Sequence, residues 1–496
     1  MAEQLSDAEI LKLREIMTGW DGGKQIDDLP ASDLTKQEKY IPVFNPSNGQ
    51  TEYMELQDAV NYSIAPRFGR VWNESLSTPT AASWTGNVEF GRELAQALKL
   101  GCYLVKNDHS RRKLAATNHY LFETGELAKL DGSMGHYQWG WGVPFYLALY
   151  KAGGLWHEEI SLRPIPGQYN YRIPVGSISA HGLASIDRDT NTLCSFVNDD
   201  AKYRGGNNNA DWDGTYRTLR GTAVTSMTCE AMRAAARRNG TGWMCGTMRH
   251  STVIKILFEI IFGTRDVQAA YNANLDADGL HQGGLGSGVT NWNGTAWSNY
   301  NGYHPFLPTT VGIDLADGCG VANYEVKDGD NNVIYTAPVP VFFGLKNFFG
   351  YLWHHQDDEF VKCNENQTRT HLVAPSIYGT WTIGNEEGMV AYSNSPETDG
   401  YIKAISYDHL ENFPTQVGGS ASTYHCDYFW KDSSTSGFRL VLRGCTAIYG
   451  SNAGSSYVVV NNGVSYSDAG LGSPLCEAEE EWPLEPVYAE AAQWGQ

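Results

Sequence analysis

Apolar residues recur at helical spacing near the start of the chain. Ser6 and Glu9 form a capping box, in which each side chain bonds a backbone N–H at the start of a helix. Three apolar residues then fall on one face of that helix: Ile10, Leu13 and Met17. The pattern predicts a helix within residues 1–20, followed by a polar linker that runs through Asp33.

Three later segments have the same helical periodicity, and each is followed within two residues by a glycine. They are residues 87–100, 226–238 and 250–262. The last of them is apolar from Val253 to Phe262, apart from Lys255 and Glu259. Residues four positions apart share one side of a helix, so we expect a buried helix with one solvent-facing stripe.

Elsewhere the apolar pattern is that of short strands. Residues 161–185 are β-like and interrupted by Pro and Gly, and from residue 275 short β-like runs alternate with long loops. No fixed-period repeat is present, which disfavours a solenoid or a propeller. Helices followed by an irregular, loop-rich β region predict an α+β fold rather than alternating βαβ units. We place a domain boundary near residue 160.

From about residue 134 the chain becomes rich in glycine and aromatic residues. Such crowding is more typical of a buried core than of a ligand platform. We therefore expect core packing for five rings: Trp139, Trp141, Phe145, Tyr146 and Tyr150.

The composition narrows the classes of function. The 496 residues include 36 Lys and Arg and 56 Asp and Glu, for a net charge of −20. Binding to nucleic acid rests on Lys and Arg that neutralise phosphates, so this charge excludes a general nucleic-acid-binding role. No apolar stretch is long enough to span a membrane, and the acidic N-terminus lacks the pattern of a signal peptide. We expect a protein made in the cytoplasm, without membrane insertion.

The nine cysteines are scattered along the chain, odd in number and without a CxxC pair. Disulfide frameworks need dense cysteines, and metal clusters need close ligand pairs. The spacing therefore predicts reduced, buried thiols.

Familiar catalytic and metal-binding motifs match poorly. A GxSxG elbow is absent, and the glycine-rich stretch at 283–291 follows a polar loop, whereas a dinucleotide-binding loop follows a strand. Residues 209–214 and 328–332 begin like calcium loops, but Arg220 and Val339 stand where the bidentate glutamate belongs. Calcium sites of another kind stay open there, and plain turns are the simpler interpretation.

Two charged clusters remain. His354 and His355 precede three acidic residues at 357–359. Adjacent histidines point in different directions and chelate a metal poorly, so we expect a solvated loop. The acidic run at 477–481 is typical of a solubilising surface segment.

The most informative segment is residues 446–471. Ser, Gly, Asn and Tyr make up 15 of its 26 residues, and Asp468 is its single charged residue. Antibody-like binding loops have this composition, because Tyr supplies contact area at low entropic cost while Ser, Gly and Asn supply adaptable hydrogen bonds. Either a binding surface on a scaffold or a glycine- and serine-rich structural meander fits this composition.

Several phrases resemble a known family: GFRLVLRG at 437–444, RRNGTGW at 237–243 and GSPLC at 472–476. In this order they are similar to the C-type lectin fold of the formylglycine-generating-enzyme type. More narrowly, they resemble the variable proteins of diversity-generating retroelements from gut Bacteroidales and their phages. The resemblance covers about residues 160–476.

The resemblance implies a division of the chain and a set of variable residues that contact a ligand. Residues 1–160 would serve attachment or oligomerisation, 161–482 would form the C-type-lectin-like ligand-binding domain with a variable segment at about 444–472, and 483–496 would be a tail. The implied ligand-binding positions are Thr446, Ala447, Ile448, Tyr449, Tyr466, Asp468, Gly470 and Leu471, with Ser455, Tyr457 and Val459 as weaker candidates.

The function implied by the resemblance is non-enzymatic binding of a bacterial surface protein or glycan at a phage tail. The protein would attach to other virion proteins through its N-terminal region and assemble as a homotrimer. The resemblance implies no cofactor and leaves open whether a structural calcium ion is bound. A bacterial cell surface is the alternative location.

Two other functions stay open. Oxidases of the same fold hold copper with two cysteines, but no matching local motif surrounds Cys426, Cys445 or Cys476, and the activity is not transferred. A purely structural protein of a virion or cell surface is the second alternative.

Overall fold

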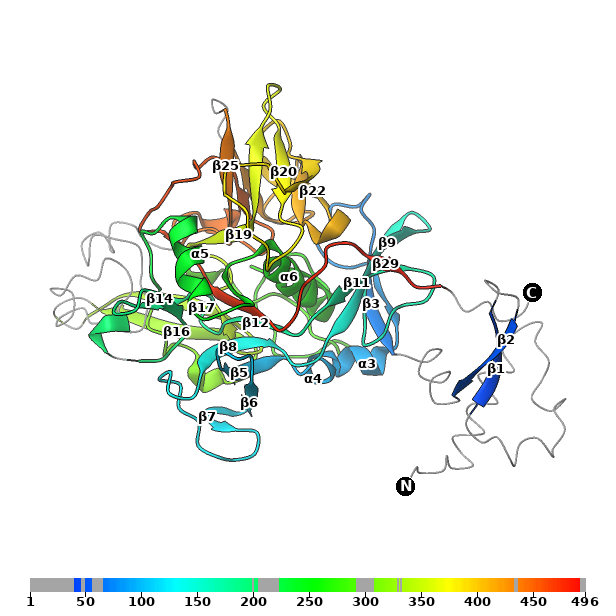
Figure 1. The fold of residues 1–496 in the computed structure, drawn as a ribbon, viewed down its shortest axis with the longest axis horizontal. Coiled ribbons are helices and arrows are strands. Elements are labelled where there is room, and N and C mark those ends of the chain that lie inside the picture. The colour runs from blue at the N-terminus through cyan, green and yellow to red at the C-terminus, as the bar shows by residue number, and fades with distance from the viewer. Residues whose placement is uncertain are drawn as a thin grey trace.

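The computed structural model describes most of the chain from residue 66 onward (Figure 1). The predicted helix within 1–20, the calcium candidate at 209–214, and residues 328, 329 and 331 of the candidate at 328–332 lie outside the described residues. Backbone alone is described for the hairpin of β1 (Tyr40–Asn45) and β2 (Gln50–Glu55). The other described residues are 66–198, 200–203, 223–290, 307–327, 330, 332–431 and 436–490.

The described part is mostly β-sheet with few helices and long loops, which confirms the loop-rich β character but matches an α+β class only loosely. An antiparallel six-stranded sheet comes first. In spatial order its strands are β29 (Val487–Tyr488), β11 (Tyr169–Ile173), β9 (Phe145–Ala152), β10 (Leu155–Ser161), β3 (Arg67–Trp72) and β4 (Ser83–Gly86). The predicted boundary near residue 160 falls inside β10, whose two neighbours both precede it in sequence.

A second antiparallel sheet has seven strands and also joins distant parts of the chain. Its order is β15 (Trp243–Cys245), β28 (Leu475–Ala478), β12 (Gly176–Ser179), β8 (His136–Trp141), β5 (Gly101–Val105), β6 (Arg111–Ala115) and β7 (Asn118–Phe122). The C-terminal β28 thus pairs with strands from the middle of the chain.

The largest sheet has nine strands and contains the segment with the binding-loop composition. Its path is β21 (Val390–Asn394), β20 (Arg369–Val373), β19 (Trp353–Cys363), β25 (Phe438–Arg443), β26 (Val458–Val459), β24 (Tyr428–Trp430), β22 (Gly400–Ser406) and β23 (Phe413–Val417), with β27 (Leu471–Gly472) pairing β19. Two of its pairings, β24 with β26 and β19 with β27, are parallel.

Smaller elements complete the fold. They are the pair β13 (Ser185–Asp187) and β14 (Thr192–Cys194), the sheet β16 (Gly320–Lys327), β17 (Val333–Phe342) and β18 (Leu345–Lys346), and short 3-10 turns that include η5 (Ile313–Leu315) and η7 (Gly450–Asn452).

The predicted helix at 226–238 is confirmed as α5 (Cys229–Arg237), and the one at 250–262 as α6 (Met248–Phe262). The segment at 87–100 instead forms two short helices, α3 (Val88–Arg92) and α4 (Leu94–Ala97), because Glu93 between them has a non-helical backbone. No helix in the described residues is long and apolar enough to cross a membrane.

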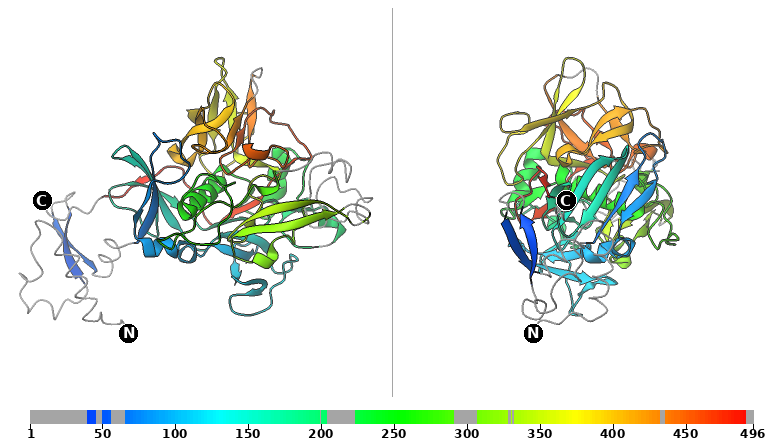
Figure 2. Two further views of the ribbon diagram at one scale, coloured as in Figure 1. Left: turned by 180° about the vertical axis from the view of Figure 1, so that it is seen from behind. Right: turned by 90° about the vertical axis from the view of Figure 1, so that its right-hand side faces the viewer.

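Helix α6 lies inside the molecule, with the nine-stranded sheet on one side and the seven-stranded sheet on the other (Figures 1 and 2). The expected solvent-facing stripe was wrong, because Lys255 and Glu259 are both fully buried. The Lys255 ammonium donates to Glu259 at 2.7 Å and to the Tyr407 hydroxyl at 2.6 Å. Pairing and hydrogen bonding offset the cost of removing these charges from water.

The aromatic core prediction is confirmed for Trp139, Trp141 and Phe145, which are fully buried, whereas Tyr146 and Tyr150 are half-buried. The same hydrophobic cluster contains Phe68 from β3 and Trp482 near the C-terminus. One core therefore combines residues from both sides of position 160.

The expectation of a solvated loop around His354 was also wrong. Residues 354–359 lie on β19, and none is more than 4% exposed. Each acid meets an arginine from a different element: Asp357 pairs with Arg233, Asp358 with Arg249 and Glu359 with Arg443. These distant partners explain why a densely charged stretch can form a buried strand.

The acidic run at 477–481 contains both exposed and buried residues. Glu479 to Glu481 are exposed, as predicted for a solubilising segment, but Glu477 is fully buried in β28. Its carboxylate accepts from Arg111 at 2.9 Å and from the Ser177 hydroxyl at 2.9 Å. A buried carboxylate held by such donors serves packing between strands, so the solubilising role was wrong for Glu477.

Candidate ligand-binding surface

The eleven candidate positions divide by burial into two groups. Six have buried side chains or, for glycine, a buried backbone: Thr446, Ala447, Tyr457, Val459, Gly470 and Leu471. Their positions follow from strand pairing, since Val459 pairs with Leu442 in β25 and Leu471 pairs with Trp353 in β19. In this structure these six contribute to packing and do not offer side chains to a ligand.

The other five candidates reach the surface. Ile448 is 50% exposed, and the rest are half-buried: Tyr449, Ser455, Tyr466 and Asp468. Tyr449 and Tyr466 both pack one side against the core beneath the nine-stranded sheet. Burial raises the pKa of both phenols. The two rings are therefore fixed features of the surface.

Tyr449 belongs to a row of five rings that we call the aromatic strip: Trp353, Tyr449, Trp430, Tyr428 and Tyr401. Successive ring centroids along this row are 5.5, 6.5, 5.8 and 5.1 Å apart. Trp430 is 37% exposed and the other four are half-buried. Tyr428 and Trp430 project to the same face because they alternate along β24.

Polar groups border the aromatic strip. The Tyr401 hydroxyl lies 3.0 Å from Ser451 Oγ and donates to Asn452 Oδ1 at 2.9 Å, which ties β22 to η7. Asp468 accepts from the backbone N–H of Gly470 at 2.7 Å. Flat rings surrounded by hydroxyl and amide groups can stack on the apolar face of a sugar or on a peptide side chain while the border supplies hydrogen bonds.

Residues 450–456, next to the strip, are held by contacts with the side chains of Asp427 and Gln268. Buried Asp427 accepts from the backbone N–H of Ser456 at 2.6 Å, and its carboxylate lies against Gly454 so closely that a Cβ there would collide with it. Burial raises the pKa of Asp427 well above its usual value. Gln268 adds hydrogen bonds to the carbonyls of Gly450 and Ala453. These contacts hold the binding-loop segment in one conformation.

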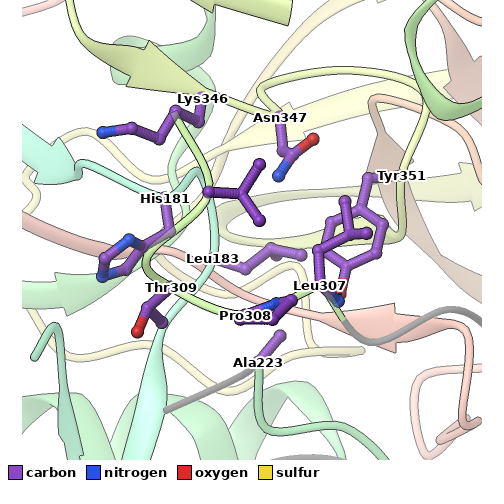
Figure 3. A pocket seen from close by; sticks show the side chains of 10 residues that line it. His181, Leu183, Ala223, Leu307, Pro308, Thr309, Lys346, Asn347 and Tyr351 are labelled. Atoms are coloured by element: carbon purple, nitrogen blue, oxygen red, sulfur yellow. The ribbon is translucent and has the colours of Figure 1, made fainter. Parts of the chain in front are cut away.

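A pocket elsewhere in the molecule is too small for an organic ligand (Figure 3). Its volume is about 10 Å³, near the lower limit for one water molecule. Lys346 and His181 lie on the same side of it (Figure 3), and burial lowers the pKa of each. Ligand binding is therefore better served by the aromatic strip than by this pocket.

The nine cysteines are free thiols, and seven of them are buried, including Cys426, Cys445 and Cys476. Cys229 on α5 and Cys245 on β15 belong to the same hydrophobic cluster, and the Cys229 thiol donates to Gln356 O at 3.5 Å. The side chains of Cys245 and His355 hold the pKa of Cys229 below its usual value, despite its burial. Sequence spacing gave no indication of this pair, because the two residues lie on different elements.

Most residues of the aromatic strip were also not predicted from the sequence. Tyr401, Tyr428 and Trp430 precede the segment with the binding-loop composition and join it through pairing of β22, β24 and β26. The Tyr-x-Trp alternation at 428–430 was the one available indication that two rings share a face.

Neither a protein-family model nor a curated protein matches this chain.

Proposed function

We propose that this protein binds a ligand non-enzymatically through the aromatic strip and the exposed part of residues 446–471. The supporting observation is the row of five partly exposed rings, of which Tyr449 lies inside the segment with the binding-loop composition. Contacts from Asp427 and Gln268 hold the backbone at Ala453 and Ser456, so this segment has little conformational freedom to lose on binding.

The proposal extends to the family resemblance. On this hypothesis the chain is a C-type-lectin-fold variable protein of a diversity-generating retroelement that acts in a phage tail and binds a bacterial surface glycan or protein. Ile448, Tyr449, Ser455, Tyr466 and Asp468 would then be the positions where variation changes the ligand. Variation at the six buried positions would instead change packing.

A weak contact at one strip would gain strength from several copies. A homotrimer would present three strips to a repetitive surface, and avidity can exceed the affinity of one site by about 10²–10⁴-fold. The net charge of −20 gives no general attraction to acidic envelopes, so specificity would depend on contacts at the strip.

The experiment measures binding of the purified protein to an array of bacterial surface polysaccharides and to intact bacterial cells. Trp430→Ala removes the most exposed ring of the strip, and we expect a loss of roughly tenfold or more in affinity. Tyr120→Ala is the matched control, because Tyr120 is 49% exposed on β7, outside the nine-stranded sheet. Equal binding by wild type and Trp430→Ala would refute the proposal.

Joint replacement of Tyr449 and Tyr466 by Ala is a less specific test. Both rings pack against the core, so this variant should lose stability as well as binding. Ile448→Ser changes an exposed side chain of the same segment and separates the two effects. A melting temperature measured for each variant identifies which loss comes from unfolding.

One observation favours an oxidase as a second candidate function. Oxidases of the resembling family hold copper with two cysteines, and Cys229 and Cys245 are here buried in the same cluster. The pair offers two sulfur ligands of the soft type that Cu(I) prefers. Titration with Cu(I) tests it: binding that Cys229→Ser removes would favour the oxidase, and absence of binding would exclude this site.

A further inference from the structure

A group of buried side chains far from the aromatic strip has the composition of a metal site. Cys102, His119 and Asp317 each offer one ligand atom, and these three atoms lie within 4.8 Å of one another. Cys102 comes from β5, His119 from β7, and Asp317 from the loop after η5. A backbone hydrogen bond from Asp317 N to Ala116 O, at 3.1 Å, fixes that loop against the β6–β7 hairpin.

Hydrogen bonds orient the three side chains toward one another. His119 Nε2 lies 2.9 Å from Asp317 Oδ1, and its Nδ1 lies 2.6 Å from the Tyr137 hydroxyl. The backbone N–H of Cys102 also donates to Asp317 Oδ1, at 2.9 Å. Metal-binding histidines commonly have their second nitrogen held in this way, which fixes the ring orientation.

One carboxylate oxygen of the group lacks a hydrogen-bond partner. The Asp317 side chain is only 7% exposed, yet its Oδ2 accepts no hydrogen bond. The ammonium of Lys113 is 3.9 Å away, beyond hydrogen-bonding distance. A buried carboxylate oxygen without a donor costs free energy, and a bound cation would satisfy it.

Two glycines leave room around the group. A Cβ built at Gly344 would lie 2.9 Å from Cys102 Sγ and 3.2 Å from Asp317 Oδ1, so the missing side chain leaves space beside both atoms. A Cβ at Gly101 would collide with the Asp317 carboxylate. Both glycines also have positive φ angles, of 93° and 142°, which other residues rarely adopt.

We propose that Cys102, His119 and Asp317 bind a divalent transition-metal ion, with Zn²⁺ as the ion that best suits one sulfur, one nitrogen and one oxygen ligand. Three protein ligands leave a fourth tetrahedral position for water. Tyr137 serves as the positioning residue for His119, and the Lys346 ammonium donates to the Tyr137 hydroxyl at 3.0 Å. The site is independent of the proposed ligand-binding function.

Two lysines place positive charge near the proposed metal site. Lys346 is buried and contacts Tyr137, and Lys113 faces the Asp317 carboxylate. Each ammonium opposes a dication, so removing one should tighten metal binding. Lys113→Gln is the suitable variant because the Lys113 side chain is partly exposed.

The experiment titrates the full-length protein with Zn²⁺ by calorimetry and with Co²⁺ by absorption spectroscopy. We expect one Zn²⁺ per chain and a thiolate-to-cobalt charge-transfer band. Cys102→Ser should remove that band and weaken Zn²⁺ binding by about tenfold or more, whereas Lys113→Gln should tighten it. Cys363→Ser, on β19, is the matched control and should change neither measurement.

Two results would overturn the proposal: no Zn²⁺ bound by the wild type, or Zn²⁺ binding that Cys102→Ser and Asp317→Asn leave unchanged. Asp317→Asn keeps the shape of the side chain and serves as the second variant if Cys102→Ser does not fold.

Discussion

The aromatic strip and the interior of the nine-stranded sheet reverse the usual distribution of side chains. The strip places uncharged rings at the surface, with Trp430 37% exposed. The sheet interior contains Asp357, Asp358 and Glu359, all at most 1% exposed. Some charged residues of this protein therefore serve packing in the interior, whereas the aromatic strip offers uncharged side chains at the surface.

The buried ion pairs of β19 show how this protein uses some of its charged residues inside a large β fold. Each buried acid of β19 is matched by an arginine from another element, so the pairs fix α5, α6 and β25 against one strand. Such pairs add little net stability but are costly to break, since the remaining charge stays buried. Exposed pairs on the same strand have no such penalty.

The largest expected effect comes from breaking one buried pair. Arg443→Met removes the two guanidinium donors to Glu359, at 2.6 and 2.9 Å, and leaves His371 as its remaining partner; we expect a loss of about 3–5 kcal/mol in the free energy of unfolding. Urea denaturation measures it.

The same strand supplies the matched control. Lys362 on β19 pairs with Glu386 at the surface, with side chains 44% and 52% exposed. Lys362→Gln should cost less than about 1 kcal/mol, because water screens this pair. Similar losses in both variants would contradict the distinction between buried and exposed charge.

A second prediction compares a buried and an exposed residue within residues 446–471. Leu471→Ala creates a cavity beside β19 and should cost about 2–5 kcal/mol in unfolding free energy. Ile448→Ala removes a half-exposed side chain and should change it by less than about 0.5 kcal/mol. Thermal unfolding of both variants is the measurement, and equal losses would mean that residues 446–471 are not divided as the structure places them.

The sequence predicted the elements whose partners are local. Helix α6 follows from its apolar run, and its end follows from Gly263, whose φ is 66°. The Thr247 side chain caps its start by accepting from His250 N. These features depend on neighbours within a few residues, so they can be recognised without tertiary information.

The sequence did not predict contacts between residues that lie far apart in the chain. Lys255 looked solvent-facing because its partner Tyr407 lies 152 positions away. The family resemblance implies Thr446 and Ala447 as ligand-binding positions, and both are buried beside Tyr351, with which they pair. The candidate metal site was missed for the same reason, since Cys102 and Asp317 are 215 positions apart. Tertiary contacts between distant segments, which the local pattern does not encode, decided each case.

A third prediction uses pH to test the buried network beside Arg443. Burial alone would lower the pKa of His371, but hydrogen bonds to Glu359 and Glu411, at 2.6 and 2.9 Å, outweigh it and raise the pKa. A raised folded-state pKa means that His371 contributes stability below its unfolded pKa of about 6.5 and loses it as pH rises through the folded value.

The measurement is urea unfolding of wild type and His371→Gln between neutral and alkaline pH. We expect the wild type to lose stability with rising pH and the variant to lose less, because its side chain does not titrate. Parallel pH profiles for the two proteins would show that His371 is not charged in the folded state.

A fourth prediction concerns a single hydrogen bond at the border of the aromatic strip. Tyr401→Phe removes the hydroxyl that donates to Asn452 Oδ1 at 2.9 Å, and Asn452→Ala removes the acceptor. In a double-mutant cycle the two should couple by about 0.5–1.5 kcal/mol, the usual net contribution of one hydrogen bond. That is well below the effect of Arg443→Met, since both groups of the border pair can turn to water when they are separated. A coupling as large as that of the buried pair would mean that the strip is part of the protein interior, and a coupling of zero would mean that η7 is held by its backbone contacts alone.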